Sequence, residues 1–230
     1  MEAIVLAGGL GTRLKTVVSD VPKPMAPVAG KPFLTYLLNW LYQNGTDHVI
    51  LSVGYKWKSI YNYLGYEYRS MKLTYSKEES PLGTGGAIAL AMENLKEDEV
   101  FIVNGDTLFL IELKNLINFH HTQKNDISIA LKPMKNFDRY GTVELDNMNY
   151  IKIFKEKQAT DNGLINGGIY LLNRSIIKLL PSKEVFSFEK DFVEKIVNKI
   201  SIGGFISDKY FIDVGIPEDY NRAQTELLIH

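Results

Sequence analysis

The sequence predicts a doubly wound α/β fold with a mixed, mainly parallel sheet. In the first half, continuous apolar runs such as Val100–Val103 alternate with amphipathic stretches, a pattern typical of parallel strands covered by helices on both faces. After about Pro133 the pattern changes to alternating apolar and polar residues, as in Thr142–Asp146, which indicates antiparallel strands. This order predicts a ligand site at the carboxyl ends of the parallel strands.

The elements of the first half follow one another in β-α order. Apolar runs predict strands at Ala3–Ala7, His48–Val53, Leu73–Ser76, Val100–Asn104 and Ile127–Leu131. Amphipathic stretches predict helices at Pro32–Asn44, Lys56–Leu64, Gly85–Leu95 and Leu113–Lys124. Asn44-Gly45 supplies the turn chemistry that commonly ends a helix, so the first helix is expected to stop there.

The second half is expected to begin with a β-hairpin. Thr142–Asp146 and Tyr150–Lys155 flank the turn residues Asn147-Met148-Asn149 and are predicted to pair as an antiparallel insertion laid over the sheet. Another strand, a helix and a closing helix are predicted at Gly167–Leu172, Ser187–Lys199 and Pro217–Leu228. Proline followed by two acidic residues, at 217–219, is good helix-start chemistry.

Length and composition fit one globular domain. The chain has 230 residues, 45% of them hydrophobic, and no low-complexity linker, so one domain over 1–230 is expected, with halves at about 1–132 and 133–230. It has no cysteine, which excludes disulfides and thiolate metal sites and fits a cytoplasmic location. A net charge of −1 and the lack of a long apolar stretch give no sign of a nucleic-acid or membrane partner.

A glycine-rich loop follows the first strand and predicts a phosphate site. Gly8, Gly9 and Gly11 let the backbone turn sharply and bring its N–H groups near an anion, while Arg13 and Lys23 add two cations. A P-loop is excluded because no glycine here precedes Lys-Ser/Thr, and the dinucleotide fingerprint lacks its third glycine and its acidic residue. An ordinary strand-to-helix turn would explain the glycines but leaves the arginine and the lysine without a role.

The segment Leu6-Ala7-Gly8-Gly9-Leu10-Gly11-Thr12-Arg13-Leu14, with Lys23-Pro24, resembles the signature of the sugar-1-phosphate nucleotidyltransferases. Further ordered segments strengthen the resemblance: Leu82–Ala87, Asn104-Gly105-Asp106, Glu156-Lys157, Asn166–Tyr170 and Asp213–Tyr220. The run Asp20–Leu34 is most similar to guanylyltransferases that act on D-glycero-α-D-manno-heptose 1-phosphate. The resemblance implies the Rossmann-like nucleotide-diphospho-sugar transferase fold, with a nucleotide half before residue 133 and a sugar half after it.

Roles in catalysis are implied by the same resemblance. Arg13 would engage the β- and γ-phosphates, Lys23 the α-phosphate and Lys157 the sugar phosphate, while Asp106 and Asp213 would hold Mg²⁺. Asp106 follows the apolar run Val100–Val103 and Asp213 follows Tyr210-Phe211-Ile212, so both are expected at the carboxyl end of a strand. Without the resemblance, Asp106 fits a turn and Asp213 a loop cap. The expected nucleotide-binding residues are Leu6, Ala7, Gly8, Gly9, Gly11, Thr12, Arg13, Lys23, Glu78, Gly83 and Thr84.

Fewer residues in the sequence indicate which base and which sugar are bound. Glu78 and Glu79 precede the second glycine loop, and a carboxylate can accept both N1–H and N2–H₂ of guanine, which favours GTP. The expected sugar-binding residues are Tyr140, Gly141, Glu156, Lys157, Asn166 and Gly167. Gly167 stands where the family has alanine, and the missing methyl is expected to leave room for a larger sugar.

The expected reaction joins a nucleoside triphosphate and a sugar 1-phosphate into a nucleoside-diphosphate sugar and pyrophosphate. GTP and the heptose 1-phosphate are the favoured substrates; UTP, dTTP or CTP with a hexose 1-phosphate is the alternative within the family. A non-catalytic sugar-nucleotide sensor and an NAD-dependent oxidoreductase are alternatives outside it. A homodimer is expected by analogy with the family alone.

Overall fold

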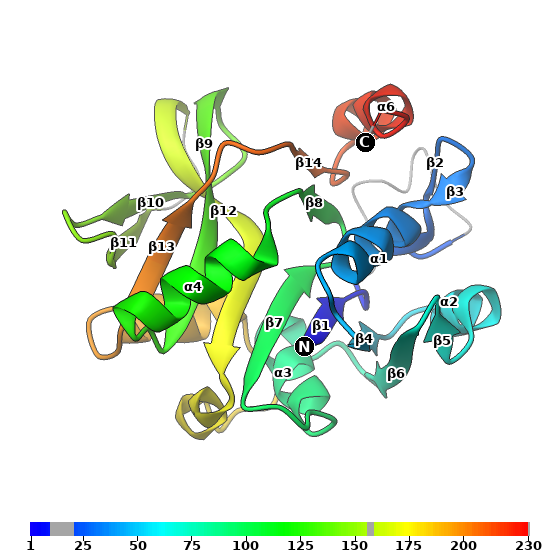
Figure 1. Cartoon of the computed structure of the whole chain (residues 1–230), viewed down its shortest axis with the longest axis horizontal. Coiled ribbons are helices and arrows are strands. Elements are labelled where there is room, and N and C mark those ends of the chain that lie inside the picture. The colour runs from blue at the N-terminus through cyan, green and yellow to red at the C-terminus, as the bar shows by residue number, and fades with distance from the viewer. Residues whose placement is uncertain (10–20, 156–158, 230) are drawn as a thin grey trace.

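The computed structural model describes residues 1–9, 21–155 and 159–229, which form a twisted sheet between two layers of helices (Figure 1). The main sheet has the strand order β11-β10-β12-β7-β1-β4-β6-β5, with β9 joined to β12 and β13 joined to β9. Neighbours β7, β1, β4 and β6 are parallel, as are β9 and β13, whereas β12 runs antiparallel to β7 and β9. The predicted mixed, mainly parallel α/β sheet is thus confirmed.

The strands near the amino terminus of the chain build the parallel part of this sheet. Their bounds are β1 (Glu2–Leu6), β4 (His48–Val53), β6 (Met71–Lys77) and β7 (Glu99–Asn104). The edge strand β5 (Glu67–Tyr68) pairs antiparallel with β6. The later strands are β9 (Ile127–Phe137), β10 (Thr142–Leu145), β11 (Ile151–Lys155), β12 (Thr160–Asn173) and β13 (Ile202–Ile206). Two small sheets join β2 (Pro27–Val28) to β3 (Lys31–Pro32), and β8 (Thr107–Phe109) to β14 (Phe211–Asp213).

The helices divide between the two faces. On one face lie α1 (Phe33–Gln43), α2 (Trp57–Leu64), α4 (Leu113–Gln123) and α6 (Pro217–Glu226), whose apolar residues share one core cluster. The other face carries α3 (Gly83–Met92), the π-helix η4 (Phe188–Val193) and α5 (Glu194–Ile196). Two 3₁₀ segments, η2 (Lys23–Met25) and η3 (Arg174–Leu179), complete the described elements. None of the described helices is long and apolar enough to span a bilayer.

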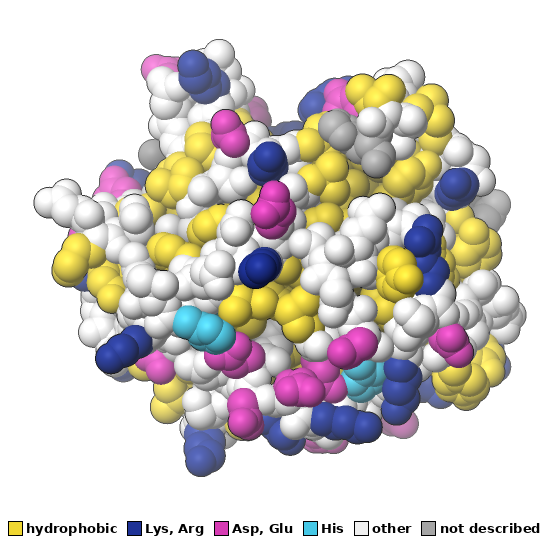
Figure 2. Space-filling view, viewed as in Figure 1, with side chains coloured by type: hydrophobic (Ala, Val, Ile, Leu, Met, Phe, Trp, Pro, Cys, Tyr) yellow, Lys and Arg dark blue, Asp and Glu magenta, His cyan; other side chains and the backbone are white. Residues whose placement is uncertain are grey.

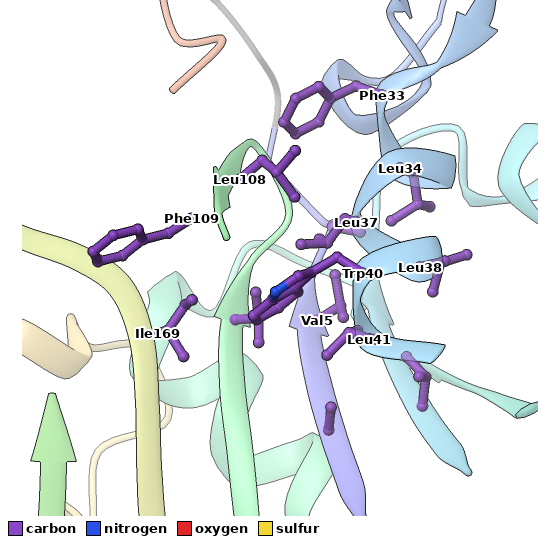
Figure 3. Close-up of a cluster of buried hydrophobic side chains, with 14 of the residues drawn as sticks. Val5, Phe33, Leu34, Leu37, Leu38, Trp40, Leu41, Leu108, Phe109 and Ile169 are labelled. Carbon is purple, nitrogen blue, oxygen red and sulfur yellow. The ribbon is translucent and has the colours of Figure 1, made fainter. Parts of the chain in front are cut away.

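The larger core cluster forms where α1 packs on the sheet (Figure 3). Phe33, Leu37 and Leu41 follow the three-to-four residue spacing of one helix face and are fully buried. Trp40 is also buried, and its indole N–H donates to the carbonyl of Ile111 at 2.9 Å, so its polar atom is satisfied inside the core. On the face shown in Figure 2, basic and acidic side chains are interspersed, in keeping with the small net charge.

The structure differs from the prediction in the second half. The predicted hairpin is present, but β10 also pairs with β12, so the hairpin extends the main sheet instead of lying over it. The helix predicted at Ser187–Lys199 is instead the π-helix η4 followed by a single turn, α5. Phe188, Phe192 and Val193 are all buried, and the wider π turn brings residues at this spacing onto one face. Strand β13 was missed because Gly203 and Gly204 weaken a strand pattern.

A buried carboxylate ties the first strand to the loop before β7. Glu2 is 3% exposed and accepts the backbone N–H groups of Lys96 and Glu97, both at 2.8 Å, while its other oxygen lies 2.6 Å from His48 Nδ1. Burial alone would raise the pKa of Glu2, but the hydrogen bonds from Glu97, His48 and Lys96 together hold it below its usual value of 4.5.

This contact predicts an acid-sensitive contribution to stability. Because the pKa of Glu2 is lower in the folded state, its contribution is present above pH 4.5 and is lost as the pH falls through the folded-state value. Glu2→Gln should therefore lower the free energy of unfolding at pH 7 and show a weaker loss of stability between pH 5 and pH 3 than the native protein. Urea unfolding across that range is the measurement; equal pH dependence in both proteins would contradict the assignment.

Candidate active site

A cavity of about 780 Å³ opens at the carboxyl ends of the parallel strands, the edge that the fold predicts for a ligand. Its walls come from the segments that follow β1, β4, β6 and β7, and from the start of α3 and η4. The lining residues are Leu6, Gly8, Gly9, Lys23, Pro24, Ser52, Gly54, Tyr55, Glu78, Glu79, Ser80, Pro81, Gly83, Thr84, Ala87, Asn104, Asp106 and Glu189.

Most of the expected nucleotide-binding residues that are described line this cavity. Ala7 is the exception, because its side chain is buried and its N–H donates to the carbonyl of Ser52 at 2.8 Å, within the sheet. At Gly8 the backbone passes close to the Glu78 carboxylate, since a Cβ there would come within 2.5 Å of Glu78 Oε1 and would displace it. Gly11, Thr12 and Arg13 lie outside the described residues.

Glu78 sits at the wall of the cavity with both carboxylate oxygens oriented. Oε2 accepts the N–H of Leu82 at 3.1 Å, and Oε1 accepts the hydroxyl of Ser52 at 3.4 Å. The carboxylate therefore shapes the loop between β6 and α3 as well as facing the cavity. Each oxygen has a second lone pair, which leaves acceptor capacity for a ligand. Glu79, the neighbouring candidate, also lines the cavity and is exposed.

The second glycine loop is held against the segment before η4. Gly83 has φ +70°, and its missing Cβ would lie 2.5 Å from the carbonyl oxygen of Phe186, so both conformation and contact require glycine. The N–H of Gly85 donates to that same carbonyl at 2.9 Å. Thr84 accepts the N–H of Phe188 at 2.8 Å, so the loop and η4 form one wall of the cavity.

Glu189 is a cavity residue that the sequence analysis missed. Its Oε2 accepts the hydroxyl of Thr84 at 2.9 Å, and its Oε1 accepts the hydroxyl of the buried Tyr170 at 2.9 Å. Tyr170 in turn accepts from the side-chain amide of Asn166 at 2.7 Å. A continuous polar chain thus joins Asn166 to the nucleotide-side loop. No local motif marks Glu189, which reaches the cavity only through the packing of η4 on α3.

Asp106 and Asp213 are brought together although they lie far apart in the sequence. Strands β8 and β14 pair with Thr107 opposite Asp213, and the N–H of Val214 donates to the carbonyl of Asp106 at 2.9 Å. Lys23 reaches both carboxylates: its Nζ forms an ion pair with Asp106 and lies 3.9 Å from Oδ1 of Asp213. The structure thus brings together three side chains to which the family resemblance assigned roles at the phosphates and the metal.

The donor chemistry of this pair fits Mg²⁺. Two carboxylates converge on one point, and a cationic group already lies between them. Magnesium is commonly held in proteins by one or two carboxylates together with substrate phosphate oxygens. Within the described part of the chain no group of three or more metal-binding side chains occurs, so substrate oxygens and water would have to complete the coordination.

A second cavity, of about 210 Å³, adjoins the first. It is lined by Asn104, Asp106, Thr107, Arg139, Tyr140, Asn166, Gly168, Phe211 and Asp213. It shares Asn104 and Asp106 with the large cavity, which places the paired aspartates at the junction. Of the expected sugar-binding residues, Tyr140 and Asn166 line it, Gly141 does not, and Glu156 and Lys157 lie outside the described residues.

Gly167 does not enlarge this cavity, contrary to expectation. A Cβ at Gly167 would come within 2.5 Å of the Phe109 ring, so the space of the missing methyl is already filled by that ring. The neighbouring Gly168 lines the cavity instead. It has φ +74°, and a Cβ there would lie 2.7 Å from the amide nitrogen of Asn104. Gly167 is therefore required by packing, and Gly168 by both packing and its positive φ.

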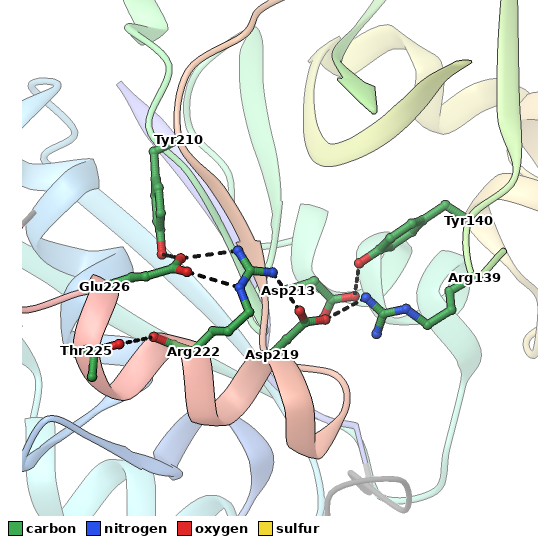
Figure 4. A network of polar contacts seen from close by, with 8 residues as sticks. All are labelled: Arg139, Tyr140, Tyr210, Asp213, Asp219, Arg222, Thr225 and Glu226. Atoms are coloured by element: carbon green, nitrogen blue, oxygen red, sulfur yellow. Dashed lines mark hydrogen bonds and ion pairs between the residues drawn. The ribbon is translucent and has the colours of Figure 1, made fainter. Parts of the chain in front are cut away.

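A polar network braces the sugar-side wall against α6 (Figure 4). Arg139 pairs with the buried Asp219 at 2.6 Å, and Asp219 also accepts from Arg222 at 2.9 Å. Tyr140 donates its hydroxyl to Oδ2 of Asp213 at 3.3 Å. Burial and the nearby Asp213 carboxylate raise the pKa of Tyr140, so it stays a neutral hydrogen-bond donor at physiological pH. Arg139 was not predicted as a site residue, because its partner Asp219 is 80 positions away in the sequence and is brought near only by folding.

Comparisons with known proteins identify relatives that match almost the whole chain. The chain is 52% identical over 227 residues to D-glycero-alpha-D-manno-heptose 1-phosphate guanylyltransferase from Aneurinibacillus thermoaerophilus, covering 99% of this chain and 98% of that one. It is 46% identical over 220 residues to the protein of the same name from Campylobacter jejuni, covering 96% and 97%. Among solved structures, HddC from Yersinia pseudotuberculosis superposes with a TM-score of 0.89 at 36% identity, covering 98% and 99%.

The same Yersinia protein complexed with GMP-PN superposes with a TM-score of 0.87, again at 36% identity, covering 98% of this chain and 99% of that one. Residues 2–229, almost the whole chain, match the family profile described as nucleotidyl transferase. The match includes the strands and loops that form both cavities. The chain belongs to the nucleotidyl transferase family.

Proposed function

We propose that this protein transfers the guanylyl group of GTP to D-glycero-α-D-manno-heptose 1-phosphate, yielding GDP-heptose and pyrophosphate. The observation that carries the proposal is the placement of Lys23, Asp106 and Asp213 at the junction of the two cavities. A nucleotide in the large cavity and a sugar phosphate in the small one would meet at this cluster. The names of the two relatives at 52% and 46% identity support the choice of base and sugar.

The reaction needs no protein nucleophile. An oxygen of the sugar phosphate attacks the α-phosphorus of GTP, a new P–O bond forms, and the bond to the β-phosphate oxygen breaks as pyrophosphate leaves. Catalysis of this kind consists of positioning and of neutralising charge. Lys23, at the junction, is suited to neutralise the α-phosphate; Arg13 and Lys157, the further cations expected from the family resemblance, lie outside the described residues.

Asp106 and Asp213 are the residues that would hold Mg²⁺ in this proposal. When bound, Mg²⁺ supplies positive charge against the phosphate oxygens. The protein's own part is to fix the two carboxylates, through the pairing of β8 with β14 and the hydroxyl of Tyr140. In this proposal the enzyme works in the cytoplasm, and as a homodimer by analogy with the family.

Recognition of guanine is assigned to Glu78. Glu78→Gln keeps one oxygen for the Leu82 N–H but places an amide against the donors of guanine. The loss of a charged hydrogen bond should raise the KM for GTP by roughly 10- to 100-fold and change kcat less. The KM for ITP, which lacks the 2-amino group, should rise less in this variant than the KM for GTP. Steady-state kinetics with both nucleotides are the measurement.

Glu79→Gln is the matched control for this prediction, because Glu79 lines the same cavity but is exposed. It should leave both KM values within about twofold. If Glu79→Gln alone raised the KM for GTP, the base contact would belong to Glu79, and an unchanged KM in both variants would remove the basis for guanine selection at this loop.

Pyrophosphate release across a grid of substrates tests the function as a whole. The grid crosses GTP, UTP, dTTP and CTP with the heptose 1-phosphate, mannose 1-phosphate and glucose 1-phosphate, with and without Mg²⁺. Turnover confined to GTP and the heptose 1-phosphate would support the full proposal. Turnover with another pair of substrates would support nucleotidyl transfer but refute the proposed specificity. No turnover by folded protein that still binds GTP would favour the alternative of a non-catalytic sugar-nucleotide sensor.

A further inference from the structure

Lys23 occupies the point between Asp106 and Asp213 where a divalent cation would be held. Its side chain is 10% exposed, and those of the two aspartates are 33% and 21% exposed, so the cluster is partly shielded from water. Its Nζ forms an ion pair with Asp106 and lies 3.9 Å from Asp213 Oδ1. The ammonium group and a metal ion cannot occupy this point together.

The backbone on each side of the contact is fixed. Lys23 stands between Pro22 and Pro24, both buried, and the N–H of Met25 donates to the carbonyl of Pro22 at 2.8 Å. Asp106 is anchored by the N–H of Gly105, which donates to the carbonyl of Leu6 at 3.0 Å. Rotation about the lysine side-chain bonds is therefore the simplest way for the ammonium group to leave the carboxylates.

The other charged and polar groups around the pair cannot replace this cation. Arg139 lines the same small cavity, but its guanidinium is paired with Asp219 at 2.6 Å. Tyr140 donates a hydrogen bond to Asp213 but carries no positive charge. Among the described residues, Lys23 is the cationic side chain in ion-pair contact with both aspartates. Without it, two carboxylates would face each other across the junction, which costs free energy.

We propose that Lys23 is a built-in substitute for the metal ion, holding Asp106 and Asp213 in place before substrates bind. A divalent cation must displace the ammonium group, so metal alone binds weakly. The α-phosphate of an incoming nucleotide offers the displaced ammonium a new partner, so nucleotide and metal bind cooperatively. Lys23 thus has two successive roles: it pairs with the two carboxylates before substrates bind, and it neutralises the α-phosphate afterwards. This inference rests on the metal site of the proposed function.

Mn²⁺ binding to nucleotide-free protein, followed by electron paramagnetic resonance of the free ion, tests the inference. Lys23→Met removes the competing charge and keeps the length of the side chain, so the affinity for Mn²⁺ should rise roughly 5- to 100-fold. Lys23→Arg restores a competing cation and should bind Mn²⁺ as weakly as the native protein. Lys31→Met, the control, removes an exposed lysine close in sequence and should change nothing.

Thermal melting gives a second readout that does not depend on turnover. In EDTA, Lys23→Met should melt below the native protein, because the carboxylates then lack a cation, and Mn²⁺ should restore more of its stability than it adds to the native protein. Adding Asp106→Asn to Lys23→Met should abolish both the tighter binding of Mn²⁺ and the rise in melting temperature that Mn²⁺ causes. If Lys23→Met bound Mn²⁺ no more tightly than the native protein, the inference would be overturned.

The same experiment separates this inference from the proposed function. Native enzyme that releases pyrophosphate only with Mg²⁺, together with unchanged Mn²⁺ affinity in Lys23→Met, would retain the function and refute the role of Lys23 as substitute. Tighter Mn²⁺ binding by Lys23→Met, together with a native protein inactive across the substrate grid, would support the role of Lys23 as a substitute for the metal ion and refute the proposed enzymatic function.

Discussion

Asp106→Asn is expected to lower kcat by about 10³-fold and to leave the fold intact, a loss typical of removing a charged group aimed at the reacting atoms. Asp106 lies at the junction of the two cavities and pairs with Lys23. The amide keeps the shape of the side chain but removes the charge that a cation needs. Pyrophosphate release at saturating substrates measures the effect, and the melting temperature reports on folding.

Asp98→Asn is the matched control, because Asp98 is an exposed aspartate in the loop before β7. Its turnover should equal that of the native enzyme. Full activity in Asp106→Asn at any Mg²⁺ concentration would show that this carboxylate does not hold the metal and would remove the main support for the proposed mechanism.

Phe188→Ala is expected to give the largest loss of stability, about 3–5 kcal/mol in the free energy of unfolding, as for other fully buried phenylalanines. The Phe188 ring is 0% exposed and packs edge-on against Tyr170, with 5.4 Å between ring centroids. Phe188 precedes Glu189, and its backbone N–H donates to the Thr84 hydroxyl at 2.8 Å, so truncation would act on the residues that form this wall. Urea denaturation gives the free energy; the KM for GTP should also rise, because the wall of the nucleotide cavity would loosen.

Val185→Ala provides the comparison for this prediction. Val185 lies three residues before Phe188 but is 56% exposed, so truncation should change stability by less than about 0.5 kcal/mol. Equally small losses in both variants would mean that η4 is held against α3 by backbone contacts and that the aromatic packing of Phe188 adds little.

The sequence was sufficient to predict the parallel half of the fold because those strands are continuous apolar runs that only a doubly covered sheet can bury. His48–Val53 was predicted with the bounds that the structure has. The run Tyr210–Ile212 before Asp213 was expected to end a strand, and β14 (Phe211–Asp213) lies there. Its partner β8 was not predicted, since three residues carry no readable period and each strand is stabilised by pairing with the other. The π-helix was missed because the periodicity of ordinary helices cannot indicate a wider turn.

The candidate site was predictable only where local motifs carry it. The glycine loop, Lys23 and Asp106 lie in short patterns that the family resemblance recognises. Glu189 and Arg139 reach the cavities through contacts made in the folded chain, with Tyr170 and with Asp219 respectively, so no local pattern identifies them. For Gly167 the local pattern gave a wrong prediction. The space of the missing methyl was expected to be open to the sugar, but the Phe109 ring, distant in the sequence, fills it.

The pairing of β14 with β8 has a consequence for when the enzyme becomes competent during synthesis. Asp213 arrives at the junction with β14, and α6, which follows, fastens to the loop after Lys23: Gln224 accepts the N–H of Ala29 at 2.9 Å and donates to the carbonyl of Pro27 at 3.0 Å. A growing chain that has released residues 1–200 from the ribosome already holds its nucleotide-side loops and the four neighbouring parallel strands β7, β1, β4 and β6, yet lacks half of the carboxylate pair. Such a nascent chain could bind a nucleotide before it could react with one.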